Sequence, residues 1–182
     1  MTACISILRG INVSGQNIIK MDALQKMYKD LGYSHITTYI QSGNIVFNVA
    51  NAQPEKLEKE ISNQIKTVFG FDVPVIVLTV DSLQEIIDNN PFAKDLNKDP
   101  GFLHVTFLSS TPEQYDIEAI EAKKSDGEEI VIDGHAVYLY CPNGYGNTKL
   151  NNSLLEKKLK VGATTRNWKT ANKLLEIAKN TG

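Results

Sequence analysis

The stretch "HITTYIQSGNIVFNV", residues 35–49, decides the fold of the first half of the chain. Its first half, "HITTYIQ", is rich in β-branched and aromatic residues, which favour a strand. The next residues, "SGN", are typical of a turn. After the turn the sequence alternates and places Ile45, Phe47 and Val49 on one face, as in a half-buried strand. The stretch therefore predicts two antiparallel strands joined by a tight turn.

The residues on either side extend this hairpin into a complete unit. The apolar runs at residues 3–9 and 73–80 predict one strand before the hairpin and one after it. Apolar residues at helical spacing in 21–31 and 57–68 predict a helix in each of the two connections. The order β-α-β-β-α-β is that of a ferredoxin-like unit, or α/β plait, with an antiparallel sheet. We therefore predict such a unit at residues 1–80.

The second half of the chain, residues 81–182, repeats this order with an added helix at each end. An Asp-Gly turn at 133–134 marks its hairpin. The Thr-Pro pair at 111–112 predicts the start of its first helix. Ser82, with a glutamate three residues later, predicts the start of the added N-terminal helix. The whole chain is therefore predicted to be an α+β protein of two ferredoxin-like units, the second with extra flanking helices.

Composition limits the class of protein. Of the 182 residues, 42% are hydrophobic and 22% are charged, as in ordinary globular proteins. No run of about 18 apolar residues is present, which predicts no membrane-spanning helix. The opening "MTACISILRG" lacks a basic leader and predicts a first strand rather than a signal peptide. The sequence therefore predicts a cytoplasmic protein.

The residues that bind metals are few and scattered. Cys4 and Cys141 both lie in apolar strand-like segments, and neither belongs to a C-x-x-C motif. The three histidines, His35, His104 and His135, have no ligand spacing. The sequence therefore predicts two reduced cysteines, no metal site and no cofactor.

Charge is unevenly distributed along the chain. The net charge is −2, but residues 81–142 carry 4 basic and 13 acidic side chains, a net charge of −9. Residues 143–182 carry 8 basic and 2 acidic side chains, a net charge of +6. The basic end could attract an anionic partner or could simply be a solvated helical face, and the sequence leaves both interpretations open.

Strand direction predicts where the polar motifs gather. In a plait, the loop after strand one and the turn after strand two lie at the same end of the sheet. "RGINVSG" (9–15) and "QSGN" (41–44) should therefore meet in the first unit. By the same argument, "CPNGYGNTK" (141–149) and "TTRNWKT" (164–170) should meet in the second. The four motifs thus reduce to two polar clusters.

These clusters contain candidates for binding an anion. Glycine-rich loops can turn backbone N–H groups toward an anion, and arginine adds a bidentate donor. Arg166 stands just before a predicted helix N-terminus, where the macrodipole disfavours a cation and favours an anion. Ordinary turn and loop roles remain alternatives, above all for Asn44. The candidate ligand-binding residues are Arg9, Asn12, Ser14, Gln41, Ser42, Asn44, Lys149 and Arg166.

The chain contains none of the common catalytic signatures. It lacks a G-x-x-x-x-G-K-[ST] phosphate loop, a G-x-S-x-G nucleophile motif, paired catalytic carboxylates and a Cys–His signature. Enzyme activity is therefore left open, without named catalytic residues.

Three motifs, "LRGINVSG", "TYIQSGNIVF" and "TTRNWKT", resemble those of the bacterial domain of unknown function 1697 family. The resemblance extends over nearly the whole chain and keeps the motifs in order. The family pattern usually has glycine where this chain has Ser14, which puts a tight anion-binding turn there in doubt. The resemblance implies a pair of ferredoxin-like α/β plaits and implies no reaction, substrate or cofactor.

Three functions compete on this evidence. The first is binding of a small anionic or phosphate-bearing ligand in a cleft between the two units, with or without catalysis. The second is a protein-interaction or structural module, in which the motifs only lock loops. The third, a nucleic-acid-binding plait, is disfavoured because strand one has no aromatic residue, strand three has only Phe47, and the chain is net acidic. The sequence does not indicate an oligomeric state.

Overall fold

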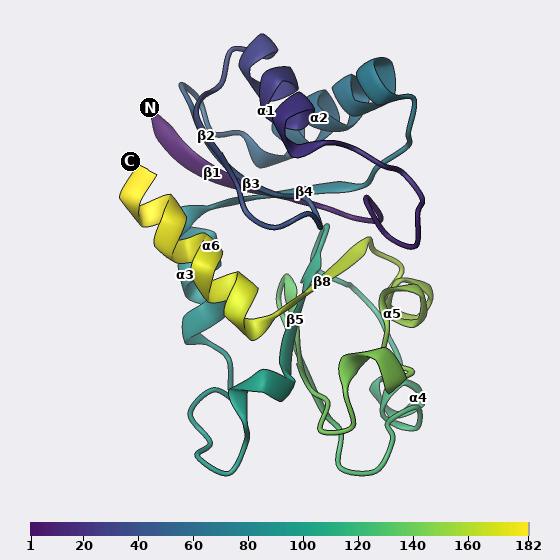
Figure 1. Cartoon of the computed structure of the whole chain (residues 1–182). Coiled ribbons are helices and arrows are strands. Elements are labelled where there is room, and N and C mark those ends of the chain that lie inside the picture. The colour runs from purple at the N-terminus through teal and green to yellow at the C-terminus, as the bar shows by residue number, and fades with distance from the viewer. Residues whose placement is uncertain (182) are drawn as a thin grey trace. The chain divides into compact units, whose positions relative to one another are not determined.

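The computed structural model of the protein describes residues 1–181. Within these residues the chain forms six α-helices and eight β-strands, and the strands make two four-stranded antiparallel sheets (Figure 1). The chain divides into two compact units. The first comprises Met1–Gln84 together with the chain from Lys173 onward, and the second is Glu85–Asn172.

The first unit contains one sheet and two helices that cover one of its faces (Figure 1). Its strands are β1 (Thr2–Leu8), β2 (Ser34–Thr38), β3 (Asn44–Val49) and β4 (Val75–Thr79). The covering helices are α1 (Met21–Asp30) and α2 (Pro54–Phe69). The strands lie in the order β2-β3-β1-β4.

The core of this unit lies between the sheet and its helices. The strands contribute Cys4, Leu8, Ile45, Phe47, Val75 and Val77, and the helices contribute Leu24, Met27, Tyr28, Leu57, Ile61 and Ile65. The Phe47 ring packs edge-on against Tyr28, with 5.3 Å between ring centroids, and stacks on Tyr33 at 4.8 Å. Burying each large apolar side chain stabilises the fold by about 1.5–3 kcal/mol, so this face fixes the strand register.

The second unit has the same sheet order with shorter covering helices. Its strands are β5 (Leu103–Leu108), β6 (Glu129–Asp133), β7 (Ala136–Tyr140) and β8 (Ala163–Asn167), in the order β6-β7-β5-β8. Its helices are α4 (Ile117–Glu121) and α5 (Asn152–Leu159). Its core includes Leu108, Ile130, Val137 and Leu139 from the strands, and Leu155 and Leu159 from α5.

Two further helices, α3 (Val80–Asp88) and α6 (Trp168–Thr181), each have residues in both units. The end of α6 is attached to the first unit, because the side-chain amide of Asn48 donates a 3.2 Å hydrogen bond to the Thr181 carbonyl oxygen. In the described chain, residues 1–181, no helix is both long and apolar enough to span a membrane.

Some predicted boundaries are wrong for local reasons. The helix predicted to start at Ser82 begins at Val80, and the Ser82 amide instead donates to the Thr79 hydroxyl at 3.2 Å. The helix predicted from residues 111–112 begins at Ile117. Its N-cap is Asp116, whose carboxylate accepts a 3.1 Å bond from the Ala119 amide. At each helix start a different residue from the predicted one, Thr79 or Asp116, accepts the capping hydrogen bond.

Candidate functional site

The loop that joins β1 to α1, residues 9–20, has an unusual backbone. Its residues with positive φ are Gly10 (76°), Asn12 (54°), Ser14 (50°), Gly15 (74°) and Asn17 (47°). Non-glycine residues rarely adopt such angles, and strained backbone of this kind clusters at functional sites. The positive φ angles of Ser14 and Gly15 belong to a two-residue hairpin turn. The turn is closed by a 2.9 Å hydrogen bond from the Gln16 amide to the Val13 carbonyl oxygen, and Val13 and Gln16 form an antiparallel bridge.

Asn12 holds this loop in place. Its side-chain amide donates to the carbonyl oxygens of Ile19 at 3.0 Å and Gln41 at 2.9 Å, and its side-chain oxygen accepts from the Ile19 amide at 2.9 Å. Its backbone N–H donates to the Asn17 carbonyl oxygen at 3.1 Å. The Asn12 side chain therefore positions the loop and joins it to the turn that contains Gln41. The predicted meeting of these two motifs is confirmed.

The turn between β2 and β3, residues 39–43, is closed by the same kind of bond. Asn44 is buried, and its side-chain amide donates to the Tyr39 carbonyl oxygen and to the Ser42 hydroxyl, both at 3.0 Å. The Tyr39 amide donates back to the Asn44 carbonyl oxygen at 2.9 Å. The strand predicted to run through Gln41 ends at Thr38, because the chain enters this bonded turn.

Gly43 attaches the turn to β1. Its carbonyl oxygen accepts a 2.8 Å bond from the Leu8 amide. It has φ of 88°, and a Cβ atom added there would lie 2.7 Å from the Leu8 Cβ and 2.9 Å from the Ile11 Cδ1. Only glycine fits this position, both because of its φ and because of the close approach of β1.

The other predicted residues of the first unit differ in accessibility. Arg9 is half-buried, and its backbone N–H donates to the Pro74 carbonyl oxygen at 3.1 Å, which fixes the start of the loop against β4. Ser14 and Gln41 are exposed. These side chains can reach a ligand in solvent, whereas Asn12 and Asn44 hold the backbone that presents them.

The predicted cluster of the second unit also lies at one end of its sheet. The last residues of β7 and β8, Tyr140 and Asn167, pair with the first residues of β5, Leu103 and His104. The motifs that follow β7 and β8 therefore leave the sheet at the same end, as predicted. Lys149, in the first of these motifs, is exposed.

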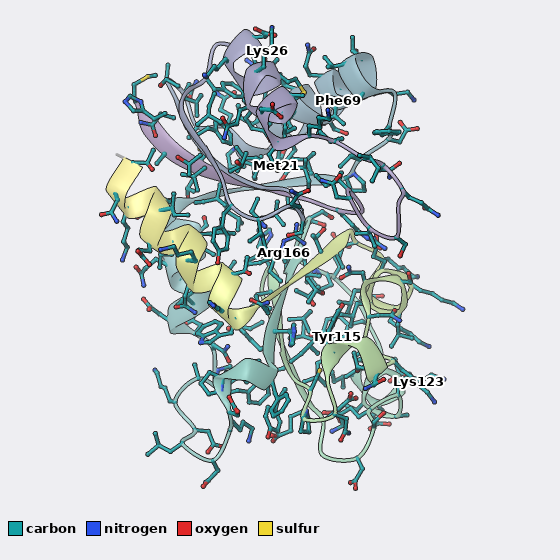
Figure 2. All side chains as sticks on the ribbon, in the orientation of Figure 1. Met21, Lys26, Phe69, Tyr115, Lys123 and Arg166 are labelled. Atoms are coloured by element: carbon teal, nitrogen blue, oxygen red, sulfur yellow. The ribbon has the colours of Figure 1, made fainter. Side chains whose placement is uncertain are left out.

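Arg166 extends from β8 (Figure 2) and is half-buried. Its guanidinium donates a 2.9 Å hydrogen bond to the Thr165 carbonyl oxygen. Burial lowers the pKa of the Arg166 guanidinium to about 10, while the nearby Tyr145 acts in the opposite direction. The side chain of Asn167 accepts a 2.8 Å bond from the Thr170 amide and so caps the N-terminus of α6. A desolvated cation beside a helix start gains stability from negative charge nearby.

Sequence reasoning missed the ring pair beside Arg166. The His104 and Tyr145 rings stack with centroids 4.7 Å apart and planes at 21°. Burial lowers the pKa of His104, which favours a neutral imidazole. The two residues are 41 positions apart in the sequence, and only the register of β5 with its neighbours reveals that they share this end of the sheet.

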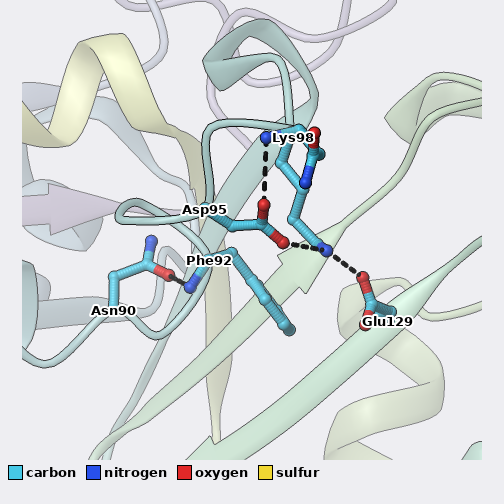
Figure 3. Close-up of polar contacts among 6 residues, drawn as sticks. Asn90, Phe92, Asp95, Lys98 and Glu129 are labelled. Atoms are coloured by element: carbon cyan, nitrogen blue, oxygen red, sulfur yellow. Dashed lines mark hydrogen bonds and ion pairs between the residues drawn. The ribbon is translucent and has the colours of Figure 1, made fainter.

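A second polar cluster, also missed, surrounds Lys98 and is called the lysine cage here (Figure 3). The Lys98 ammonium lies 2.8 Å from Asp95 and 2.7 Å from Glu129. It also lies 5.7 Å from the Phe92 ring centroid and 5.1 Å from the Tyr140 ring centroid. Both carboxylates raise the pKa of Lys98, and the hydrogen bond from Lys98 is the main cause of the lowered pKa of Asp95. The cage fastens the segment before β5 to the second sheet.

A hollow of about 190 Å³ lies elsewhere in the first unit, between the end of β3 and the start of α2. Its lining includes Tyr33, whose hydroxyl donates a 2.8 Å bond to Glu60, and the ammonium-bearing Lys56. None of the predicted ligand-binding residues lines it. Among residues 1–181, no group of three or more potential metal-ligating side chains is present.

These features define an α+β protein with two four-stranded antiparallel sheets of the same strand order. The chain belongs to the DUF1697 family, described as "Protein of unknown function", whose profile matches residues 1–138. This match confirms the resemblance and contains the first two motifs, "LRGINVSG" and "TYIQSGNIVF".

One similar solved structure is described as "The structure of conserved bacterial protein SP0830 from Streptococcus pneumoniae". The two chains are 23% identical, the match covers 97% of this chain and 98% of that one, and the TM-score is 0.71. At this identity the likeness shows a shared fold. No curated protein sequence matches the chain.

Proposed function

We propose that the protein binds a small anionic or phosphate-bearing ligand at the 9–20 loop of the first unit. The observation that carries the proposal is the exposed tight turn of this loop, whose residues Ser14 and Gly15 both have positive φ. Backbone N–H groups in glycine-containing turns can coordinate an anion. Gly10, Ser14 and Gly15 are exposed, so a ligand can reach the loop from solvent.

Charge supports the same ligand class. The loop contains Arg9 and Lys20 and no acidic residue, so its own side chains favour an anion. Arg9 stands at the fixed start of the loop, where a guanidinium can add two parallel bonds to a phosphate or carboxylate. Asn12 and Asn44 hold the loop and turn before a ligand arrives, which lowers the entropic cost of binding.

The second unit supports an anionic ligand by a separate argument. Arg166 lies just before the start of α6, where the helix dipole favours an anion, and Lys149 lies exposed in a motif at the same end of its sheet. The sequence-based hypothesis that Arg9 and Arg166 act on one ligand remains a proposal. It predicts that the double variant Arg9→Ala/Arg166→Ala binds the ligand more weakly than either single variant. If only one of the single variants changes the affinity, and the double variant matches it, the two arginines do not act on the same ligand.

The direct test is a titration of the ¹⁵N-labelled protein with inorganic phosphate and with sulfate, followed by amide chemical shifts. We expect the shifts to concentrate on Gly10, Ser14 and Gly15, and Arg9→Ala to weaken binding about tenfold. Lys29→Ala, an exposed lysine in the last turn of α1, is the matched control. Small shifts spread over the whole surface, equal in both variants, would refute the proposal.

Arg166→Ala separates a ligand role from a structural one. A ligand role predicts weaker phosphate binding with thermal stability nearly unchanged. A large loss of stability, with no anion bound by the wild type, would make Arg166 a structural residue and favour the interaction module.

The remaining hypotheses from the sequence differ in their support. Phe47 is buried under the helices of its own unit and is therefore unable to stack on a base. This supports the expectation that the protein does not bind nucleic acid tightly. The strand order of both sheets supports classifying each unit as a ferredoxin-like plait. A protein-interaction function is favoured by one observation, the exposed aliphatic side chains near the loop.

A further inference from the structure

Three aliphatic side chains of the first unit are exposed around Asn12. Val13 is 55% exposed, Ile18 is 57% exposed and Ile40 is 50% exposed. Each lies next to Asn12 or to a residue hydrogen-bonded to it: Val13 follows Asn12, Ile18 lies between Asn17 and Ile19, and Ile40 precedes Gln41. The same hydrogen bonds that fix the loop and turn therefore fix the backbone of all three exposed residues.

Ile40 has the most unfavourable position of the three. Its φ is 50°, in the left-handed region that β-branched residues rarely adopt. The bonded pair Tyr39 and Asn44 closes the turn around it and holds this angle. Half of the Ile40 side chain nevertheless remains exposed to solvent. Burial within this chain therefore offsets little of the cost of the strained backbone. A strained, exposed isoleucine is explained if its contact is with another molecule.

We propose that Val13, Ile18 and Ile40, with the basic 9–20 loop, bind a peptide segment of another protein that carries both carboxylate and aliphatic side chains. We call these residues the loop–turn surface. The inference rests on the proposed function, because the carboxylate would be the anion that the loop coordinates. Charge complementarity identifies the partner, since the loop has two basic residues, Arg9 and Lys20, and no acidic one.

The amount of charge favours a peptide over a membrane surface. Recognition of anionic lipid typically uses clusters of about four to eight basic residues, and this loop has two. A basic loop with exposed backbone amides can also bind a single carboxylate, including the C-terminal carboxylate of a peptide. A short acidic segment with two or three aliphatic side chains matches both the charge and the exposed residues.

The test selects peptides from a displayed random library on the immobilised wild-type protein. A parallel selection on the triple variant Val13→Ser/Ile18→Ser/Ile40→Asn removes sequences that bind elsewhere. We expect the peptides specific to the wild type to combine Asp or Glu with Leu, Ile or Val. Each is then synthesised with a free and with an amidated C-terminus, and its affinity is measured by fluorescence anisotropy. The difference between the two forms separates a C-terminal carboxylate from a side-chain carboxylate.

Single variants decide whether the loop–turn surface is responsible. Val13→Ser and Ile40→Asn should each weaken peptide binding about tenfold. Val68→Ser changes an equally exposed valine, 51%, on α2 and should leave binding unchanged. Because asparagine tolerates the left-handed region, Ile40→Asn should leave the melting temperature unchanged or higher. A marked fall in its melting temperature would refute the role of strain, and Val13→Ser would still test the surface.

Three outcomes would overturn the inference. In the first, the wild type and the triple variant select the same peptides. In the second, Val68→Ser weakens binding as much as Val13→Ser. In the third, the protein binds phosphatidylglycerol vesicles through these residues and binds none of the selected peptides. Phosphate binding at the loop without peptide binding would leave the proposed function intact. Peptide binding that persists when phosphate produces no loop shifts would remove the proposed small-anion function instead.

Discussion

The 9–20 loop and the lysine cage fasten irregular segments to their own sheets by different chemistry. In the loop, a single neutral side chain, Asn12, makes three bonds to backbone groups. In the cage, a charged side chain, Lys98, is shared among two carboxylates and two aromatic rings. Amide–backbone bonds have fixed geometry and carry no net charge. Ion pairs tolerate small displacements but depend on ionisation and salt.

The difference indicates how each region responds to change. Removing Asn12 takes away the side-chain partner of the Ile19 amide, the Ile19 carbonyl oxygen and the Gln41 carbonyl oxygen. Removing Lys98 leaves Asp95, which still accepts a 2.9 Å bond from the Asn97 amide. We therefore expect the stability contributed by the loop to be sensitive to single substitutions and insensitive to pH. We expect the stability contributed by the cage to depend on pH and to be less sensitive to single substitutions.

The largest expected effect is that of Gly43→Ala, at the point where the turn meets β1. The new Cβ would overlap Leu8 and Ile11, and alanine would be strained at φ of 88°. Overpacking and strain together should lower the free energy of unfolding by about 3 kcal/mol or more, measured by urea denaturation. Gly70→Ala, at φ of 80° with open space around it, should cost only about 1–2 kcal/mol. Equal losses in the two variants would show that β1 yields to the added atom.

The second effect is that of removing the Asn12 side chain. Asn12→Gly keeps the freedom to adopt φ of 54° and loses all three side-chain bonds. We expect the free energy of unfolding to fall by about 2–3 kcal/mol. Amide hydrogen exchange should accelerate at Ile19, whose N–H donates to Asn12 in the wild type. If exchange at Ile19 is unchanged, the loop is held by other contacts.

The third effect concerns the cage. Lys98→Met keeps much of the aliphatic stem and removes the charge, so it removes both ion pairs and the cation–π contacts. We expect a lower melting temperature, with a smaller decrease than that of Asn12→Gly, because the carboxylates are partly exposed. Lys94→Met, an exposed lysine in the same segment, is the control and should leave the melting temperature unchanged. A decrease as large as that of Asn12→Gly would contradict this ranking.

Sequence periodicity predicted the sheets because their signals are local. Alternation in residues 44–49 and the apolar run of β1 identify strands, and the order of elements then fixes which strands pair. Strand direction even predicted which polar loops meet. The helix starts were predicted less well, because more than one residue near each start can cap a helix. Thr79 and Asp116 accept the capping hydrogen bonds in the structure, in place of the residues predicted from the sequence.

The structural roles of the candidate site residues could not be predicted from the sequence, because they depend on contacts between distant positions. Asn12 was a candidate ligand residue, but its partner Gln41 lies 29 positions away and is identified only by the fold. The positive φ of Ile40 conflicts with its β-branched side chain, so propensity placed it in a strand. The lysine cage joins Lys98 to Glu129 and Tyr140, and no motif links these residues.

The smallest expected effect is a pH dependence confined to the cage. The pKa of Asp95 is lowered in the folded protein, mainly by its hydrogen bond from Lys98. Its stabilisation is therefore present above the unfolded pKa, about 4, and is lost as the pH falls through the lower folded pKa. The pKa of Lys98 is raised, so its contribution is complete below about pH 10 and is lost only as the pH rises through the raised value. The difference in melting temperature between the wild type and Lys98→Met should therefore be constant between about pH 5 and 9 and should shrink toward about pH 2. The difference between the wild type and Asn12→Gly should show no such change, because amide–backbone bonds do not titrate. If the Lys98→Met difference persists in acid, the contacts with the aromatic rings, and not the ion pairs, hold the cage closed.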